Sequence, residues 1–437
     1  MTLSLPLDDI RQRLDDAPMS RTQVMAVATT ILLSAVDGFD VLSVTFAAPA
    51  ITHDWGIDKA ALGVVLSAGL AGMAAGSFFL APLADSLGRR GLVIASLVLM
   101  ALGSCGSAAA GSIGALTAWR VVTGLGIGAC ISVINPLAAE FASGRRRPLA
   151  VALMSLGYPA GGLVGGLIAA ALMPVHGWRS VFVAGAVATF VLLPVVALFL
   201  PESPSFLAAR GGAHHLARLD RLLARFGHHD IAAQPSGRPR QVGYRLVFAP
   251  DRIGATLRLS IVNLLVAAVS YYLLSWLPQL VADAGQKPST ASLISATMSL
   301  IGIAGGLLVG GLANRFGQAR VTAIAVIGLG LSIAAFGAAS LSTVSLFVMA
   351  ALCGFCLFGS AAGFYGVLAR SFGDAERASG SGFVIGVGRV SSAVSPLLAG
   401  YLFAAGFGRT GVSGGFAAAA LVAAALLFIH ARKGIVR

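Results

Sequence analysis

Runs of about twenty apolar residues recur along nearly the whole chain and are separated by short charged breaks. A helix of this length is sufficient to cross a hydrocarbon core of roughly 30 Å. Only 11% of the 437 residues are charged, which is too few for the water-facing surface of a soluble protein of this size. The chain is therefore predicted to be an all-α integral membrane protein.

We expect twelve transmembrane helices arranged as two six-helix bundles. The expected spans are residues 23–48, 61–83, 91–111, 114–137, 149–173, 180–200, 259–281, 291–312, 320–341, 344–368, 379–405 and 411–431. The corresponding divisions are an N-terminal segment (1–22), an N-terminal bundle (23–201), a basic loop (202–256), a C-terminal bundle (257–431) and a tail (432–437).

Positive charge is distributed unevenly between the two sides of the expected bundle. Of the thirty Lys and Arg residues, twenty-four fall on one side, four on the other and two inside spans. Cytoplasmic loops carry an excess of Lys and Arg, so the rich side is predicted to be cytoplasmic, with both termini on it. Membrane topology thus explains the net charge of +13, and no nucleic acid partner is predicted. Residues 7–14 are predicted to form a short amphipathic helix at the membrane surface.

The polar stretch of residues 202–256 divides the chain, and nine arginines lie between the sixth and seventh spans. Two histidine pairs in it could bind a metal: His214-His215 and His228-His229. A solvated basic loop is the interpretation we adopt. Cys353 and Cys356 could likewise form a redox or metal pair, but inside a span small packing residues are the favoured interpretation. No metal site is predicted.

Two turns, one in each half, share a pattern. The turn after the second span reads APLADSLGRR at residues 81–90, and the turn after the eighth reads GGLANRFGQAR at residues 310–320. Each has an Asp or Asn at a helix end, a glycine able to adopt positive φ, and arginines near the lipid surface. The repetition indicates a duplicated architecture, as expected of a transporter.

This pattern resembles the signature of the major facilitator superfamily. Three further segments fit: Arg120-x-x-x-Gly124-x-Gly126, residues 157–162, and Pro201-Glu202-Ser203-Pro204. The resemblance implies a conformational latch that favours the outward-open state. Its residues would be Asp85, Gly88, Arg89, Arg90, Asn314, Arg315 and Gly317. The first turn departs from the family pattern at Ala81 and Ser86, and a simple helix cap is the alternative role for Asp85.

Ionisable residues inside a membrane span are costly and are functional candidates. Away from the span ends there are four: Asp37 and Asp40 in the first span, Arg120 in the fourth and Arg389 in the eleventh. Their charges sum to zero. The two aspartates lie three residues apart, hence on one helix face, and Gly38 between them lets a neighbouring helix approach.

These charges suit proton and anion handling. Two like charges in one apolar site do not both ionise easily, so Asp37 and Asp40 are suited to exchanging a proton as access alternates. Arg120 is expected at a depth where it could meet Asp40, although a permanent ion pair that specifies helix packing is the alternative. Arg389 could clamp an anion, because a guanidinium binds a carboxylate bidentately. A structural pairing with Asp37 is the alternative for Arg389.

The superfamily lines its cavity largely with the first, fourth, seventh and tenth helices, which directs attention to polar and aromatic residues there. The seventh span offers Asn263, Tyr271, Tyr272, Trp276 and Gln279, and the tenth offers Phe358, Phe364 and Tyr365. An aromatic ring could stack on these faces while their polar tips bond hydroxyl groups. Trp and Tyr also gather at membrane interfaces, which is the alternative for each.

Three segments resemble the aromatic acid:proton symporter branch of the superfamily. They are Asp37-Gly38-Phe39-Asp40 with residues 49–51, residues 273–278, and residues 386–389 with 396–400. The resemblance implies a monomeric bacterial inner-membrane protein that imports a benzoate-like or hydroxybenzoate-like acid with protons. It assigns roles to Asp37, Asp40, Arg120, Glu140 and Arg389. The proton gradient would supply the energy, and no cofactor is implied.

Other functions remain open at this point. A sugar or other small-metabolite porter shares the Pro201-Glu202-Ser203-Pro204 segment and the paired turns, but a neutral sugar gives Arg389 no clear role. A drug efflux antiporter is a weaker alternative. A non-transporting nutrient sensor would be expected to carry an added signalling domain. No enzymatic activity is predicted, because the spans contain no nucleophile–base pair or metal-ligand cluster that we identify.

Overall fold

The computed structural model describes residues 3–5, 7–228, 231–233, 248–250, 252–338, 342–372 and 377–432. Side chains are described for these residues except 3–5, 7–10, 231–233, 314, 377 and 378.

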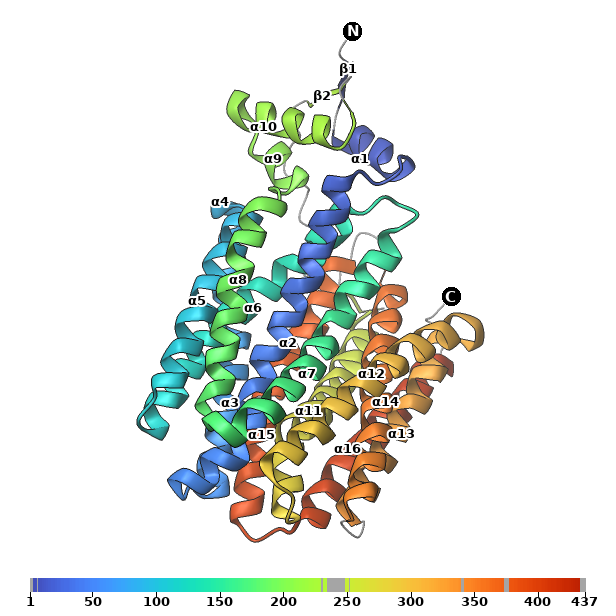
Figure 1. The fold of residues 1–437 in the computed structure, drawn as a ribbon. Helices are drawn as coiled ribbons and strands as arrows, with labels where there is room; N and C mark the ends of the chain where they lie inside the picture. The colour runs from blue at the N-terminus through green and yellow to red at the C-terminus, as the bar shows by residue number, and fades with distance from the viewer. Residues whose placement is uncertain are drawn as a thin grey trace.

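Twelve helices in the described part of the chain are long and apolar enough to cross a membrane, which confirms the predicted spans (Figure 1). The N-terminal six are α2 (Arg21–Trp55), a crossing at Lys59–Leu87, α5 (Arg89–Ala109), α6 (Ile113–Phe141), α7 (Arg147–His176) and α8 (Arg179–Phe199). The C-terminal six are α11 (Ile253–Asp283), α12 (Pro288–Phe316), α13 (Gln318–Ala338), α14 (Thr343–Ser371), α15 (Arg377–Ala404) and α16 (Arg409–Arg432).

The second crossing is not a single regular helix. It consists of α3 (Lys59–Ala75), a π-helical turn η1 (Gly76–Leu80), a 3₁₀ turn η2 (Ala81–Leu83) and α4 (Ala84–Leu87). Pro82 has no backbone N–H to donate and its ring crowds the preceding turn, so the hydrogen-bonding pattern changes around it. This irregular stretch leads directly into the first of the two repeated turns.

Short elements gather at one end of the bundle, which we call the basic end (Figure 1). They are β1 (Leu3–Leu5), α1 (Leu7–Asp16), α9 (Pro204–Arg210), α10 (Gly212–Arg225) and β2 (Ile231–Ala233), with β1 and β2 paired in parallel. The helix predicted at residues 7–14 is confirmed as α1. The prediction of a plain loop at residues 202–256 was wrong for α9 and α10. Leu219, Leu222 and Leu223 give α10 an apolar stripe that is buried against the N-terminal bundle.

Helices approach closely where glycines face a neighbouring backbone. A Cβ on Gly38 of α2 would clash with the carbonyl group of Tyr158 in α7, and a Cβ on Gly161 would clash with the carbonyl of Ala35. The two helix backbones therefore touch beside the aspartate pair, as the glycine at position 38 predicts.

Buried apolar side chains form two clusters. One runs through the C-terminal bundle and continues into the N-terminal bundle at the end opposite the basic end, where Phe46 and Leu62 join Leu277 and Val281. The other lies in the N-terminal half and includes the apolar side of α10. Polar contacts reinforce the junction at the opposite end: Lys59 pairs with Asp283, and Thr52 donates to Gln279 at 3.3 Å. The two halves are therefore joined at the end opposite the basic end.

Candidate functional site

Asp37 and Asp40 lie in the middle of α2, each only 1% exposed. Within the described part of the chain, neither oxygen of Asp37 has a hydrogen-bond partner, and neither does Oδ2 of Asp40. Oδ1 of Asp40 accepts a long bond from the Ser104 hydroxyl at 3.4 Å. Burying an ionised carboxylate without donors is costly. Each aspartate must therefore be compensated by a proton or by a nearby cation.

Arg120 of α6 reaches the same region and is also 1% exposed. Its Nη2 donates to the backbone carbonyl of Asp40 at 2.7 Å, and its Nη1 donates to Ser43 at 3.3 Å. The guanidinium lies 5.7 Å from the ring centroid of Phe182. A space of about 10 Å³ beside Arg120 has room for about one water. The expected meeting of Arg120 and Asp40 thus occurs through the backbone of α2 and not through a carboxylate–guanidinium pair.

Arg389 of α15 comes from the other half of the molecule. It lies within electrostatic range of both Asp37 and Tyr271 of α11. Tyr271 in turn interacts with Tyr158 of α7 and Tyr365 of α14. Tyr271 also packs against both apolar clusters. The structure therefore brings an acid, a fixed cation and three phenol groups together between the two halves.

Tyr158 was not among the predicted site residues. Its hydroxyl is buried without a hydrogen-bond partner among the described residues, and it interacts electrostatically with Asp37 and Tyr271. The contact between α2 and α7 at Gly38 places it there. The sequence signal for Tyr158 is a tyrosine inside the glycine-rich segment at residues 157–162, and that segment pointed only to the fold.

Tyr272 and Trp276 do not join this group, although we expected them to. The hydroxyl of Tyr272 lies 2.8 Å from the Ser413 hydroxyl, and its ring stacks on Phe416 at 4.2 Å between centroids. Trp276 donates from its indole nitrogen to the Pro396 carbonyl at 3.0 Å. Both side chains are almost completely buried inside the C-terminal bundle. Their contacts are those of packing residues.

The other predicted cavity residues are spread over α11 and α14. Asn263 donates to the Val384 carbonyl at 2.8 Å and packs against Gly388, so it joins α11 to α15 next to Arg389. Phe364 is buried in the C-terminal core, whereas its neighbour Tyr365 is 58% exposed. Phe358 packs on the same core and Gln279 lies at the junction opposite the basic end.

The first repeated turn holds a carboxylate, but not that of Asp85. Asp85 is exposed, and its carboxylate forms no ion pair with another described residue. Instead, Oε1 of Glu202 accepts the backbone N–H groups of Arg89, Arg90 and Ser203 at 2.8, 3.1 and 3.0 Å. The first N–H groups of a helix lack partners inside it and favour an anion. Glu202 therefore fixes the start of α5, a role that the Pro201-Glu202-Ser203-Pro204 motif alone did not reveal.

Glu140 belongs to the same network. It forms an ion pair with Arg89 and accepts the Ser203 hydroxyl at 2.6 Å. Twenty residues of α6 separate it from Arg120, which corresponds to about 30 Å. The structure therefore places Glu140 with the turn at the basic end, far from Asp37 and Asp40, and its role in proton coupling stays a prediction.

The two repeated turns are unequal. Gly88 and Gly317 both adopt positive φ, 84° and 97°, as predicted. Arg315, however, is exposed and only stacks on Phe316, with no ion pair to any carboxylate that the structure describes. The side chain of Asn314 lies outside the described residues. Among the residues that the structure describes, only the first turn carries a network of charged side chains.

Known proteins that resemble this chain show the family to which it belongs. A sequence model of the Major Facilitator Superfamily matches residues 30–279 and 259–435. A gallate transporter of Pseudomonas putida is 33% identical over 413 residues, covering 93% of this chain and 92% of that protein. The 4-hydroxybenzoate transporter PcaK of Pseudomonas putida is 30% identical over 387 residues, covering 87% and 86%. A 3-(3-hydroxy-phenyl)propionate transporter of Escherichia coli is 30% identical over 410 residues, covering 93% of each chain.

Solved structures agree on the fold. The xylose transporter XylE from Escherichia coli, in a partially occluded inward-open conformation, superposes with a TM-score of 0.75 at 15% identity, covering 94% of this chain and 98% of that one. The relatives are named as transporters and not as enzymes, in line with the prediction that this chain is no enzyme. With the family model matching both halves and twelve spans in place, this multi-pass membrane protein belongs to the Major Facilitator Superfamily.

Proposed function

We propose that the protein is a proton-coupled symporter that imports a small aromatic carboxylic acid, such as a benzoate or hydroxybenzoate, by alternating access. The observation that carries this proposal is that Asp37, buried without a hydrogen-bond donor among the described residues, lies within electrostatic range of Arg389 from the other half of the molecule. The names of the gallate, 4-hydroxybenzoate and 3-(3-hydroxy-phenyl)propionate transporters support the substrate class.

Arg389 and the tyrosines have the chemistry for such a substrate. The guanidinium of Arg389 would hold the substrate carboxylate in a bidentate contact. The phenol groups of Tyr158, Tyr271 and Tyr365 would offer ring faces for stacking and hydroxyls for the ring substituents. The buried Tyr158 hydroxyl makes no hydrogen bond of good geometry with the described residues and has the Tyr271 phenol beside it, so it can turn to bond a substrate hydroxyl.

Competition for Arg389 gives a physical reason for proton coupling. In the empty carrier Arg389 partly compensates an ionised Asp37, against the larger cost of burial. When a substrate anion takes over the guanidinium, Asp37 loses that compensation, and a proton becomes its cheapest replacement. Binding of one anion thus favours uptake of one proton, and the loaded site carries no additional charge across the membrane interior.

Orientation follows from the positive charges. With the basic end in the cytoplasm, as the excess of Lys and Arg indicates, both termini are cytoplasmic and the halves are joined at the periplasmic end. We infer that this conformation faces inward. Rocking of the halves about the central site would then return it to the outward-facing state, in a bacterial inner membrane, with a single chain as the working unit.

Uptake into proteoliposomes with an acidic exterior tests the proposal. We expect the wild-type chain to accumulate labelled 4-hydroxybenzoate and Asp37→Asn to lose gradient-driven accumulation while it still exchanges internal for external substrate. Asp58→Asn is the matched control, because Asp58 is exposed and caps α3, where asparagine caps equally well. Undiminished gradient-driven accumulation by Asp37→Asn would refute the coupling mechanism, and absence of uptake of any aromatic acid by the wild type would refute the substrate class.

A further inference from the structure

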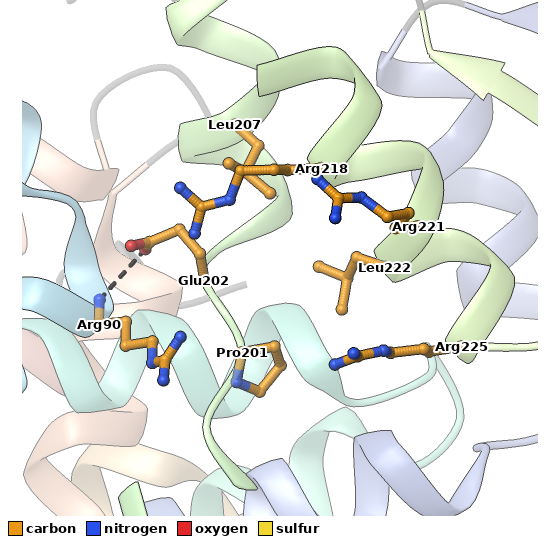
Figure 2. A pocket seen from close by; sticks show the side chains of 8 residues that line it. All are labelled: Arg90, Pro201, Glu202, Leu207, Arg218, Arg221, Leu222 and Arg225. Atoms are coloured by element: carbon orange, nitrogen blue, oxygen red, sulfur yellow. Dashed lines mark hydrogen bonds between the residues drawn. The ribbon is translucent and has the colours of Figure 1, made fainter. Parts of the chain in front are cut away.

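A cavity of about 150 Å³ lies at the basic end, between α10, the end of α8 and the start of α5. Its lining consists of Arg90, Pro201, Glu202, Leu207, Arg218, Arg221, Leu222 and Arg225. Four of these eight residues are arginines and one is acidic, so the lining carries a formal charge of +3. Figure 2 shows the arginines of α10 extending from one side of the cavity and Arg90 from the other.

The arginines of α10 lie on one face of the helix. Arg218, Arg221 and Arg225 follow a spacing of three and four residues, which places them along one face of the helix. The leucines between them are buried against the N-terminal bundle and hold α10 in place. No carboxylate in the described part of the chain pairs with Arg218 or Arg225.

Glu202 offsets only one of the four positive charges and forms no ion pair with the arginines. Its Oε1 already accepts three backbone N–H groups at the start of α5 and beside it. Arg90 donates from Nη2 to the Ala197 carbonyl, but its Nε is buried and has no acceptor among the described residues. A buried charged donor without an acceptor is costly. The cavity thus has an excess of positive charge and a donor that lacks its partner.

The surroundings of the cavity are those of a lipid-facing surface. Leu87 at the end of α4 and Leu198 near the end of α8 are 56% and 76% exposed, and Phe199 is 40% exposed. These apolar side chains lie within three residues of Arg90 and Pro201, which line the cavity, so the acyl chains of a lipid held there would run along them. Arginine-rich pockets at the cytoplasmic surface suit anionic headgroups, since guanidinium groups bind phosphate oxygens bidentately.

We propose that this cavity binds the phosphate group of an anionic phospholipid of the cytoplasmic leaflet, such as phosphatidylglycerol. Arg218 and Arg225 contact the phosphate from α10, and the Nε of Arg90 gains an acceptor from the other side. The site lies apart from Asp37 and Arg389, so it goes beyond the proposed transport activity and can be tested without it.

The test is a binding titration of the purified full-length protein in neutral detergent with dioctanoyl-phosphatidylglycerol. Dioctanoyl-phosphatidylcholine has the same chains and no net charge, and glycerol phosphate and inorganic phosphate have the charge without the chains. We expect saturable binding of the phosphatidylglycerol alone. The double variant Arg218→Gln/Arg225→Gln should weaken the binding of phosphatidylglycerol about 30-fold, because each arginine contributes about 1 kcal/mol, or slightly more than fivefold in affinity. Arg225→Gln alone should weaken this binding about fivefold, and this single variant is the test if the double variant does not fold.

Arg145→Gln/Arg146→Gln is the matched control, because these exposed arginines lie at the same end outside the cavity. Its affinity should stay within twofold of the wild type. Equal weakening by both double variants would show general attraction to the basic end and overturn the site. Unchanged affinity in folded pocket variants would do the same. If the soluble phosphates bound as tightly as the lipid, the pocket would be a site for a free phosphate compound and the lipid proposal would be wrong.

Discussion

Asp37 and Asp40 are three residues apart in α2 but have different cations beside them. The cation near Asp40 is Arg120, which is bonded to the backbone of the same helix and belongs to the same half. The cation near Asp37 is Arg389, which belongs to the other half. The proposed rocking of the halves would change the distance from Asp37 to Arg389 and leave the Asp40 environment intact. We therefore expect Asp37 to carry the transported proton and Asp40 to hold Arg120 in place.

Substitution of Arg389 tests whether its planar group holds the substrate. Arg389→Lys keeps the charge but loses the bidentate geometry, so we expect the KM for 4-hydroxybenzoate uptake to rise about tenfold. Arg389→Gln should abolish saturable uptake. Arg145→Lys, at an exposed position, is the control and should leave KM unchanged. A KM for Arg389→Lys equal to that of the wild type would exclude a direct contact between Arg389 and the carboxylate.

Tyr158→Phe tests recognition of ring hydroxyls. Because the Tyr158 hydroxyl makes no hydrogen bond of good geometry and interacts only weakly with Tyr271, its removal should destabilise the fold little. We expect the affinity for 4-hydroxybenzoate to fall about fivefold, the value of one hydrogen bond, while the affinity for benzoate stays the same. Competition between the two acids in uptake measures this ratio. Tyr272→Phe, which removes a hydroxyl bonded to Ser413, should lower stability without changing the ratio.

At the residue scale, the sequence identified the charged part of the site but not the aromatic part. Asp37, Arg120 and Arg389 could be found because charge inside an apolar span is rare. Tyr271 and Tyr272 could not be told apart, because adjacent residues on a helix point about 100° apart and α11 is apolar on most sides. Which one faces the site depends on the rotation of α11, and that is set by packing against its neighbours.

Among the elements, the first repeated turn depends on a residue outside itself. Glu202, at the end of α8, supplies the negative charge that α5 needs at its start. Its carboxylate also lies where a Cβ on Gly88 would have to be. The turn, the start of α5 and the end of α8 therefore form one mechanical unit.

Glu202→Gln should weaken this unit, because the amide keeps an acceptor but loses the charge that stabilises the helix start. We expect a loss of about 1–2 kcal/mol in unfolding free energy, measured as a lower melting temperature of the purified protein. Asp85→Asn is the comparison and should change stability by less than about 0.5 kcal/mol, since Asp85 is exposed. Equal effects of the two substitutions would contradict the assignment of Glu202.

The two glycines of the repeated turns give a second test at this scale. Gly88→Ala and Gly317→Ala both place a side chain at positive φ, which costs about 1–2 kcal/mol. Only at Gly88 would the new Cβ also displace Glu202, whereas nothing lies within 4 Å at Gly317. We expect Gly88→Ala to reduce the uptake rate and the melting temperature more than Gly317→Ala. The reverse order would mean that the second turn is the more important one.

The sequence predicted the ends of the spans to within about seven residues because membrane thickness sets the length of an apolar run. It did not predict α9 and α10. Arginines and histidines dominate α10, and its leucines stabilise a helix only when the end of the N-terminal bundle is there to cover them. A short surface helix of this kind depends on tertiary contacts that no local pattern reveals.

For the whole molecule, the junction opposite the basic end decides which side is closed. A continuous apolar cluster crosses between the halves there, and Lys59 pairs with Asp283 across them. Alternating access requires this junction to separate. The sequence predicted two halves but not which end would be in contact, because the two arrangements of a carrier differ by only a few kcal/mol.

A cross-link at the junction tests this requirement. In Lys59→Cys/Asp283→Cys, a short bis-maleimide should join the two halves and stop uptake, while either single variant should keep its activity after the same treatment. Proteoliposome uptake before and after cross-linking measures the effect, and a mass shift of the tryptic peptides shows its extent. Full transport by a completely cross-linked protein would show that this end does not open.

The same junction has an optical consequence. Trp178 and Trp276 belong to the apolar cluster that joins the halves, and Trp55 packs against it. Trp119, the remaining one of the four tryptophans, is near the start of α6 in the same half of the membrane. Intrinsic tryptophan fluorescence therefore reports on one gate only. Separation at that gate exposes the indole rings to water and moves their emission to longer wavelength. Rearrangements among the arginines at the other end leave the emission unchanged. The fluorescence of an unlabelled protein can therefore reveal which gate a ligand moves.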